Sequence, residues 1–391
     1  MNNILFLSPA DWHGPRGRFQ HIAEGLSSHN KLAYFDGLGV RPIGLRDWRR
    51  VLNKFKLAMS AASTVRRETP RNILHVSPLA VPIQGNSIIG VINRAVLHRV
   101  IQNTLDKLGG SGDPLIWISY PHPDLVKVLE RFPNCHVIYD CVDHWSEFNG
   151  AFGNLAQAER TLIERADIVF ATAELLQERV ARYHPRCYLV PNGVDVEGYA
   201  LALAESPSIP ADVQPISRPR IGFIGNIAHW LEFDWIRRLV INRPEWQFVF
   251  VGPWQLLDAP PESPNFHWLG ARNYETIPYY IASFDVCLIP FKDNELTRAV
   301  DPLKLYEYLA VGRPVVSTAL PRLFPFSEFV EIASTEEAFQ EGILRALADR
   351  SVERDEHRRR SVIQHSWTAR LRCINEHIER DLGISLMPDP A

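Results

Sequence analysis

Short apolar runs without in–out alternation recur along this chain, and they restrict its fold more than any other feature. In the first half they include ILFLS, LIWISY, HVIYDCV and DIVFAT. Strands that are apolar on both faces are typical of a parallel sheet covered by helices on each side. Helix-like segments such as RFQHIAEGLSS and ELLQERVARY lie between these runs. The βα alternation predicts an α/β fold.

A proline-rich stretch divides this alternation into two series. Residues 204–219, AESPSIPADVQPISRP, hold four prolines and little periodicity, so they are expected to form a linker. A second series of strands follows in RIGFIG, QFVFVG, FHWLG, VCLIP and PVVST. We therefore expect two Rossmann-like doubly wound domains, 1–203 and 220–350, facing a central cleft that binds the ligand. The charged helical residues 351–391 are expected to return to the first domain.

Composition narrows the class of protein. The chain has 391 residues, of which 46% are hydrophobic and 22% charged, as in soluble globular proteins of two domains. No apolar stretch reaches the ~18 residues of a membrane-spanning helix, and the N-terminus looks like a first strand and not a signal peptide. Five scattered cysteines without a CxxC pair argue against disulfides or zinc and favour a reducing cytosol.

Charge is distributed unevenly along the chain. Residues 1–107 hold 15 basic and 6 acidic side chains, a balance of +9, so the remainder carries −12. The basic excess is greatest in residues 46–68, where apolar and basic side chains alternate. Such a helix can lie on an anionic membrane surface or be an ordinary solvated face, and the sequence leaves both open. We expect no nucleic acid partner.

The stretch VDPLKLYEYLAVGRPVVST, residues 300–318, has the pattern of an anion site. Asp301 is expected to cap a helix whose first residue is Pro302. The helix would begin just after a strand, so its free N–H groups and partial positive charge would attract phosphate. Lys304 adds a full positive charge in the first turn.

Glu307 lies one turn further along the same helix face. Its carboxylate can accept two hydrogen bonds from a vicinal diol such as ribose. Gly312 is expected to end the helix, before the strand that begins at Pro314. A surface ion pair between Lys304 and Glu307 is the alternative explanation of the two charges. The strand–loop–helix context favours a nucleoside diphosphate site.

These residues carry a resemblance to a known family. PLKLYEYLAVGRPVV is similar to the donor-site signature of GT-B glycosyltransferases. The segments DWHGPRGRFQHIAEGLS, VPNGVD, RIGFIGNIAHWLEFD and NFHWLGARNYETIPYYIASFDVCLIPF resemble other family elements in the expected order. YDCVDHWSEF resembles the teichuronic-acid-type group of polysaccharide glycosyltransferases. The resemblance covers nearly the whole chain.

The resemblance implies the GT-B fold and transfer of a sugar from a UDP- or GDP-linked donor. The acceptor would be a hydroxyl of a glycan or lipid-linked acceptor in cell-surface polysaccharide synthesis, at the inner face of the cytoplasmic membrane. The family needs no cofactor and typically no metal, and this chain lacks an Asp-x-Asp motif. The donor-binding residues it implies are Lys304, Glu307, Pro302, Gly225, Asn226, His229, Arg272 and Tyr274.

Two departures leave the stereochemical outcome open. Retaining relatives have a second glutamate eight positions before Glu307, where this chain has Ala299. They also hold the phosphates with an arginine and a lysine after the first donor-domain strand, where this chain offers Asn226 and His229.

An inverting enzyme needs a base for the acceptor hydroxyl. Asp143 and Asp140 follow an apolar strand of the first domain, and we favour Asp143, although it could instead cap the next helix. The candidates for contact with a charged acceptor or the donor phosphates are Arg16, Arg18, His21 and His144. A solvated positive loop explains the first three equally well.

Other functions fit less well. A nucleotide-sugar epimerase or a non-catalytic nucleotide-sugar-binding protein would share the fold and the donor site. A NAD-dependent oxidoreductase is disfavoured, because neither ILFLSPADWHG nor GFIGNIAHW carries G-x-G-x-x-G.

Overall fold

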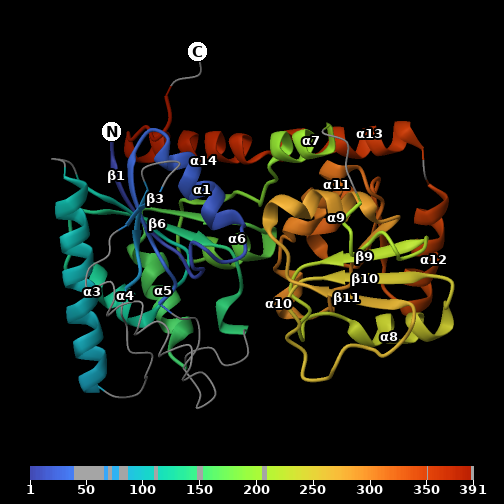
Figure 1. Cartoon of the computed structure of the whole chain (residues 1–391). Helices are drawn as coiled ribbons and strands as arrows, with labels where there is room; N and C mark the ends of the chain where they lie inside the picture. The colour runs from blue at the N-terminus through green and yellow to red at the C-terminus, as the bar shows by residue number, and fades with distance from the viewer. Residues whose placement is uncertain are drawn as a thin grey trace. The chain divides into compact units, whose positions relative to one another are not determined.

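The chain folds into two compact units, shown in Figure 1. The first comprises residues 1–191 and 370–391, and the second comprises residues 192–369. The computed structural model describes residues 1–38, 66–68, 73–78, 87–109, 113–147, 153–204, 209–349 and 351–388.

The first unit is built on an eight-stranded sheet with the order β3-β4-β2-β1-β5-β6-β7-β8. All pairs are parallel except β3 with β4, which is antiparallel. The strand order reverses between β1 and β5, so the chain winds outward from the middle of the sheet. The strands are β1 Asn3–Leu7, β2 Lys31–Phe35, β3 Arg66–Glu68, β4 Ile73–Val76, β5 Leu115–Ile118, β6 His136–Cys141, β7 Ile168–Ala171 and β8 Cys187–Leu189.

Helices cover this sheet in two groups. α3, α4 and α5 pack on one another. α1 instead packs on α14, where a Cβ on Gly25 would lie 2.1 Å from a methyl of Leu371, so only glycine permits this approach. The helices are α1 Arg18–Ser27, α3 Ser87–Leu108, α4 Pro123–Leu129, η2 Trp145–Glu147, α5 Leu155–Arg165, α6 Glu174–Ala181 and α14 Trp367–Leu382.

The second unit has a fully parallel six-stranded sheet with the order β11-β10-β9-β12-β13-β14. Its order reverses between β9 and β12. In open α/β sheets, ligands bind outside the carboxyl ends of the strands at this reversal. The strands are β9 Arg220–Ile224, β10 Gln247–Val251, β11 Phe266–Gly270, β12 Val286–Ile289, β13 Val315–Thr318 and β14 Val330–Ala333.

The helices of the second unit form two layers, with α9 and α11 on one face of the sheet and α8 on the other (Figure 1). Trp235 of α8 meets Phe339 of α12 at 5.8 Å between ring centroids, which joins those two helices. The helices are α7 Val196–Ala204, α8 Phe233–Asn242, η3 Tyr274–Thr276, α9 Ile277–Ser283, α10 Glu295–Arg298, α11 Leu303–Val311, η4 Pro321–Phe326, α12 Glu336–Ala348, α13 Val352–Ser361 and η5 Ile363–His365.

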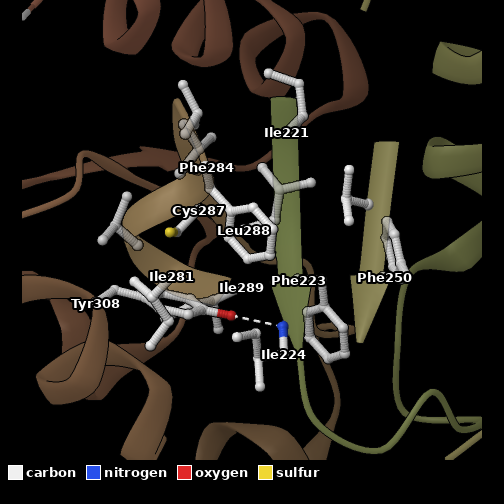
Figure 2. Packing of buried hydrophobic residues seen from close by; sticks show 14 of the residues in the cluster. Ile221, Phe223, Ile224, Phe250, Ile281, Phe284, Cys287, Leu288, Ile289 and Tyr308 are labelled. Carbon is white, nitrogen blue, oxygen red and sulfur yellow. Dashed lines mark hydrogen bonds between the residues drawn. The ribbon is translucent and has the colours of Figure 1, made fainter. Parts of the chain in front are cut away.

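The core of the second unit fixes the end of β9 against α11. Figure 2 shows Ile221, Phe223 and Ile224 of β9 among apolar side chains of the neighbouring elements. The backbone N–H of Ile224 donates to the hydroxyl of Tyr308 at 2.9 Å, a bond drawn in the figure. This hydrogen bond therefore fixes the position of α11 relative to the last residue of β9.

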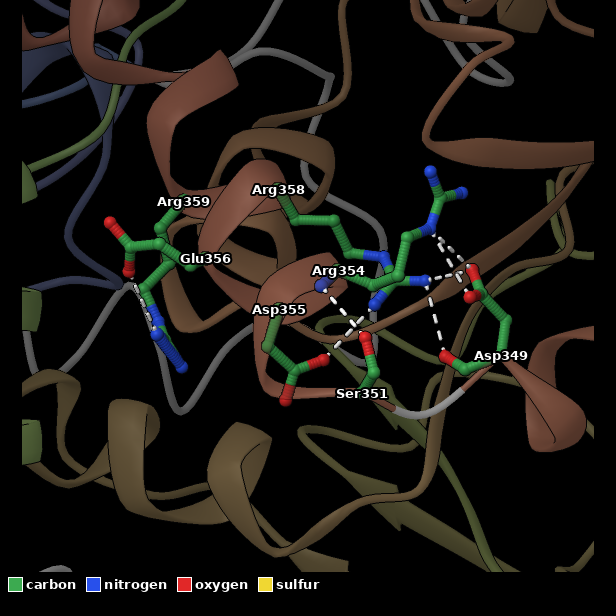
Figure 3. Close-up of polar contacts among 7 residues, drawn as sticks. All are labelled: Asp349, Ser351, Arg354, Asp355, Glu356, Arg358 and Arg359. Atoms are coloured by element: carbon green, nitrogen blue, oxygen red, sulfur yellow. Dashed lines mark hydrogen bonds and ion pairs between the residues drawn. The ribbon is translucent and has the colours of Figure 1, made fainter.

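α13 packs on α11, and a polar network shown in Figure 3 ties α13 to Asp349, the residue that ends α12. The buried guanidinium of Arg358 donates to Asp355 at 3.0 Å and to Asp349 at 2.5 Å. Gly312 ends α11 at φ +86°, and a Cβ there would lie 2.7 Å from the carbonyl oxygen of Asp355. The two helices thus meet where only glycine fits.

The α/β prediction is confirmed, and each apolar run quoted above contains a strand. β3 was not expected, because RRE has no apolar pattern. α7 was not expected either, and it packs on α11 in the second unit. Since its Tyr199 lies in that unit's core, the units divide at Pro191 and not near residue 203.

The basic segment 46–68 lies outside the described residues from 46 to 65. Residues 66–68 form β3, so the expected helix does not extend through them. Among the helices that the structure describes, none is both long and apolar enough to cross a membrane.

Candidate functional site

Lys304 lies at the strand-order reversal of the second unit. Its Nζ is 5.4 Å from the ring centroid of Phe223 in β9 and 5.3 Å from that of Phe291, which follows β12. Aromatic faces attract ammonium groups, so the two rings hold the charge beyond the carboxyl ends of these strands. Burial lowers the pKa of Lys304, and the neighbouring Glu307 opposes that shift.

Gly225 makes room for this lysine. It adopts φ +133°, and a Cβ there would lie 2.6 Å from Cε and 2.8 Å from Nζ of Lys304. Any other residue would be strained and would displace the lysine. Asn226 follows directly and is partly buried. The structure therefore brings together Gly225 and Lys304, two of the expected donor-binding residues, and their binding of the donor stays a prediction.

The start of α11 differs from the expectation in one respect. Pro302 is the N-cap at φ −75°, and Asp301 does not cap the helix, so that prediction is wrong. The buried carboxylate of Asp301 instead accepts from the N–H of Asn192 at 2.6 Å, from Tyr306 Oη at 2.8 Å and from Arg322 Nε at 3.2 Å. These bonds of Asp301 fix the start of the helix.

Glu307 lies on the same helix, with a partly exposed side chain. Burial raises its pKa, while Lys304 and the hydroxyl of Tyr199 lower it. Tyr199 meets Tyr274 edge to face at 6.4 Å between centroids. The structure thus brings Tyr274 to the surroundings of Glu307. Tyr199 was not predicted, because no sequence pattern links it to a glutamate more than one hundred residues away.

The other predicted donor residues lie in the second unit with contacts of their own. The Arg272 guanidinium donates to Asp212 at 2.6 Å and to Tyr280 Oη at 2.7 Å. His229 is exposed and meets Trp230 edge-on at 5.1 Å. Neither has a contact with Lys304 or Glu307 among the interactions that the structure describes, so their part in the site stays a prediction.

In the first unit, Asp140 at the end of β6 is buried and paired. Arg18 Nη2 donates to its Oδ1 at 2.7 Å, and Arg18 Nε donates to its Oδ2 at 2.9 Å. Arg18 Nη1 also donates to the carbonyl of Pro191 at 3.2 Å. Both side chains are almost fully buried, so Arg18 does not belong to a solvated positive loop. This geometry gives the pair a structural role.

The other face of β6 is held in the same way. Arg179 donates to both oxygens of the buried Glu159 at 2.7 and 2.8 Å, and Tyr139 donates to Glu159 Oε1 at 2.7 Å. The Cys141 thiol lies 3.8 Å from the same oxygen. Charge-paired networks on both faces make the end of β6 a rigid base for the residues that follow.

Asp143 lies two residues beyond β6 and is half-buried. Burial raises the pKa of its carboxyl to about 7. No hydrogen bond to this carboxylate is found among the described residues. A carboxylate with a pKa near the operating pH can accept a proton in catalysis, which favours Asp143 over the paired Asp140 as the base.

The remaining candidates lie around the N-terminal loop and after β6. Arg16 pairs with Glu24 through both guanidinium branches, with one bond at 2.9 Å. His21 is buried in α1, and His144 is half-buried beside Asp143. Their contacts with substrates stay predictions. All five cysteines are free thiols.

Sequence comparison assigns a known family to most of the second unit. Residues 218–349 match the family of glycosyl transferases group 1, so this segment is a domain of that family. The chain is 31% identical over 228 residues to TuaH of Bacillus subtilis (strain 168), which is assigned as a teichuronic acid biosynthesis glycosyltransferase. That match covers 53% of this chain and 55% of the relative, so the chain spans about half the length of this curated relative.

Structural comparison identifies the fold of both units. Anabaena Alr3699/HepE in complex with UDP and glucose is similar over 97% of this chain and 100% of its own, with a TM-score of 0.64 and 14% identity. A UDP-forming trehalose-phosphate synthase from Burkholderia vietnamiensis is similar over 98% and 100%, with a TM-score of 0.68 and 13% identity. The chain has the two-domain GT-B fold.

Proposed function

We propose that this protein is a glycosyltransferase of cell-surface polysaccharide synthesis. It would transfer a sugar from a nucleotide-linked donor to a hydroxyl of a glycan or lipid-linked acceptor. The observation that carries the proposal is the position of Lys304, held by two aromatic rings at the strand-order reversal of a glycosyl transferases group 1 domain.

The second unit would bind the nucleoside diphosphate of the donor. Lys304 and the N-terminus of α11 would stabilise the charge that develops on the leaving diphosphate. Glu307 would accept hydrogen bonds from the two ribose hydroxyls. UDP is the first nucleotide to test, because the similar Anabaena and Burkholderia structures are named for UDP. The proposal includes transfer without a metal or other cofactor.

The first unit would bind the acceptor, and Asp143 would remove the proton from its hydroxyl. An inverting transfer needs a base of this kind, and the configuration of the product decides between inversion and retention. TuaH supports a polysaccharide acceptor. Residues 46–68 would contact the anionic inner face of the cytoplasmic membrane, which sedimentation with phosphatidylglycerol vesicles at low and high salt tests.

A binding experiment tests the donor site. Thermal unfolding is measured with UDP, GDP, ADP, CMP and TDP on the wild type and on Glu307→Ala and Lys304→Met. A ligand at ~100 times its dissociation constant adds about 2.7 kcal/mol, a clear shift in Tm. Glu341→Ala is the matched control, since that glutamate is exposed on α12.

We expect one nucleotide to raise the Tm of the wild type and of Glu341→Ala, with the shift lost in both site variants. Absence of any shift in the wild type would remove the main support for the proposal. Incubation with the sugar-linked nucleotide then separates the related functions. A transferase forms product only with acceptor, and an epimerase converts the donor alone.

A further inference from the structure

Tyr199 of α7 is buried in the second unit, and its polar hydroxyl is buried with it. Its side chain is 1% exposed, in the core that joins α7 to α11. Its hydroxyl has no hydrogen bond of standard geometry to any described residue. Buried polar groups are almost always paired, and one left unpaired in a native structure often serves a function.

The surroundings of this hydroxyl point to one partner. α7 packs on α11, the helix that carries Glu307, and the ring of Tyr199 lies 6.4 Å from that of Tyr274, so the hydroxyl lies next to the side chains of Glu307 and Tyr274. Burial and the adjacent carboxylate raise the pKa of Tyr199 well above its ordinary value, so the phenol keeps its proton. Tyr199 is thus a permanent donor beside a carboxylate.

A phenylalanine at this position would fill the core equally well. Packing alone therefore does not explain the hydroxyl. The orientation of Glu307 explains the hydroxyl, because a carboxylate binds a vicinal diol only when its plane is fixed and its negative charge is kept.

We propose that Tyr199 is a positioning residue that orients Glu307 by donating its O–H to the carboxylate. The remaining lone pairs of Glu307 then accept from the 2′- and 3′-hydroxyls of a ribonucleoside diphosphate. This inference rests on the proposed function. It adds that the site selects ribonucleotides over 2′-deoxyribonucleotides and that Tyr199 sets that selectivity.

The test compares two nucleotides that differ by one hydroxyl. Calorimetry gives the Kd of UDP and of 2′-deoxyuridine diphosphate for the wild type, Tyr199→Phe, Glu307→Gln and the double variant. If another nucleoside diphosphate stabilises the wild type better, that nucleotide and its 2′-deoxy form replace the uridine pair. Tyr183→Phe, an exposed tyrosine of the first unit, is the control.

We expect the wild type and Tyr183→Phe to prefer the ribonucleotide about tenfold, a difference of about 1.4 kcal/mol. Tyr199→Phe should reduce that preference to about twofold, with little change for the deoxynucleotide. In the Glu307→Gln background the tyrosine substitution should have no further effect, since both act on the same hydrogen bonds.

The Tm of ligand-free Tyr199→Phe should stay close to that of the wild type, because the phenylalanine ring fills the same core and only one hydrogen bond to a partly exposed carboxylate is lost. A purely structural tyrosine would instead lower the Tm and weaken both nucleotides equally, which would overturn the inference. Unchanged selectivity in a stable Tyr199→Phe would overturn it as well. If the wild type binds no nucleoside diphosphate at all, the proposed function itself fails.

Discussion

The guanidinium of Arg18 holds both carboxylate oxygens of Asp140, at 2.7 Å for Nη2–Oδ1 and 2.9 Å for Nε–Oδ2. The two residues come from α1 and the end of β6, and their side chains are 3% and 0% exposed. A pair this deeply buried is stable only while both charges are present. Asp140 therefore anchors β6, and the base that we propose is Asp143, two residues beyond the strand.

Asp140→Asn should destabilise the first unit strongly. The substitution leaves the Arg18 charge buried without its counter-ion, which costs about 3–5 kcal/mol of unfolding free energy. Urea denaturation followed by tryptophan fluorescence measures the loss. Glu164→Gln is the control, since its carboxylate pairs with Arg160 on the exposed surface and contributes below about 1 kcal/mol. Wild-type stability in Asp140→Asn would contradict the structural role.

Asp143 should govern the pH dependence of transfer. Its carboxyl acts as a base only when ionised, and burial raises its pKa to about 7. We therefore expect kcat/KM to rise with pH and to level off above about pH 7. Asp143→Asn should lose about 10²–10⁴-fold in kcat and should still bind the nucleotide. A variant that keeps its turnover would exclude Asp143 as the base.

The same carboxyl should make the protein less stable as pH rises. Its folded pKa of about 7 exceeds the ordinary value of 3.8, so the folded state binds the extra proton between these values. Its contribution to stability is thus present below about pH 4 and is lost as pH rises toward 7. Asp143→Asn should gain Tm relative to the wild type at pH 8, and the gain should shrink at pH 5. An equal difference at both pH values would contradict the raised pKa.

Local rules predicted the strands of this protein, because parallel strands covered on both faces need apolar side chains at every position. They also predicted the end of α11, since Gly312 takes a positive φ that other residues avoid. The same rules failed at Asp301. Its carboxylate would cap the helix if only neighbours mattered, yet it binds Asn192 and Arg322, which are distant in sequence.

In the candidate site too, local sequence patterns predicted some residues, and others depend on contacts between distant segments. Lys304 and Glu307 could be predicted because they share one helix with a recognisable pattern. Tyr199 could not, since it reaches Glu307 only after α7 has packed on α11. The sequence around Arg18 and around Asp140 predicted a place in the cleft for each residue. Their pairing joins residues that are 122 positions apart in the chain, so it could not be predicted locally.

Two arginines of α13 offer a matched comparison of burial. Arg358 and Arg354 both bind Asp349, but their side chains are 3% and 41% exposed. Arg358→Ala removes a buried side chain together with its bonds to the partly exposed Asp349 and Asp355, so it should cost about 1–3 kcal/mol. Arg354→Ala should cost below about 1 kcal/mol. Thermal and urea unfolding of the two variants measure both losses. Equal losses would show that the number of ion pairs in the network of Figure 3, and not their burial, determines its contribution to stability.

Gly225→Ala should remove Lys304 from its place between the two rings. The new Cβ would lie 2.6 Å from Cε of the lysine, and alanine is strained at φ +133°. We expect nucleoside diphosphate affinity to fall about tenfold or more, as in Lys304→Met, with a stability loss of about 1–3 kcal/mol. Calorimetry measures the affinity. Gly153→Ala, where an added Cβ meets no heavy atom within 4 Å, should bind as the wild type does.

The double variant Gly225→Ala with Lys304→Met decides how the glycine acts. If its only effect on binding is to displace the lysine, the double variant should bind no more weakly than Lys304→Met alone, because both changes remove the same interaction. If the two losses add in full, the backbone around Gly225 contacts the diphosphate independently of Lys304. The phosphate site would then include the loop after β9 as well as the start of α11.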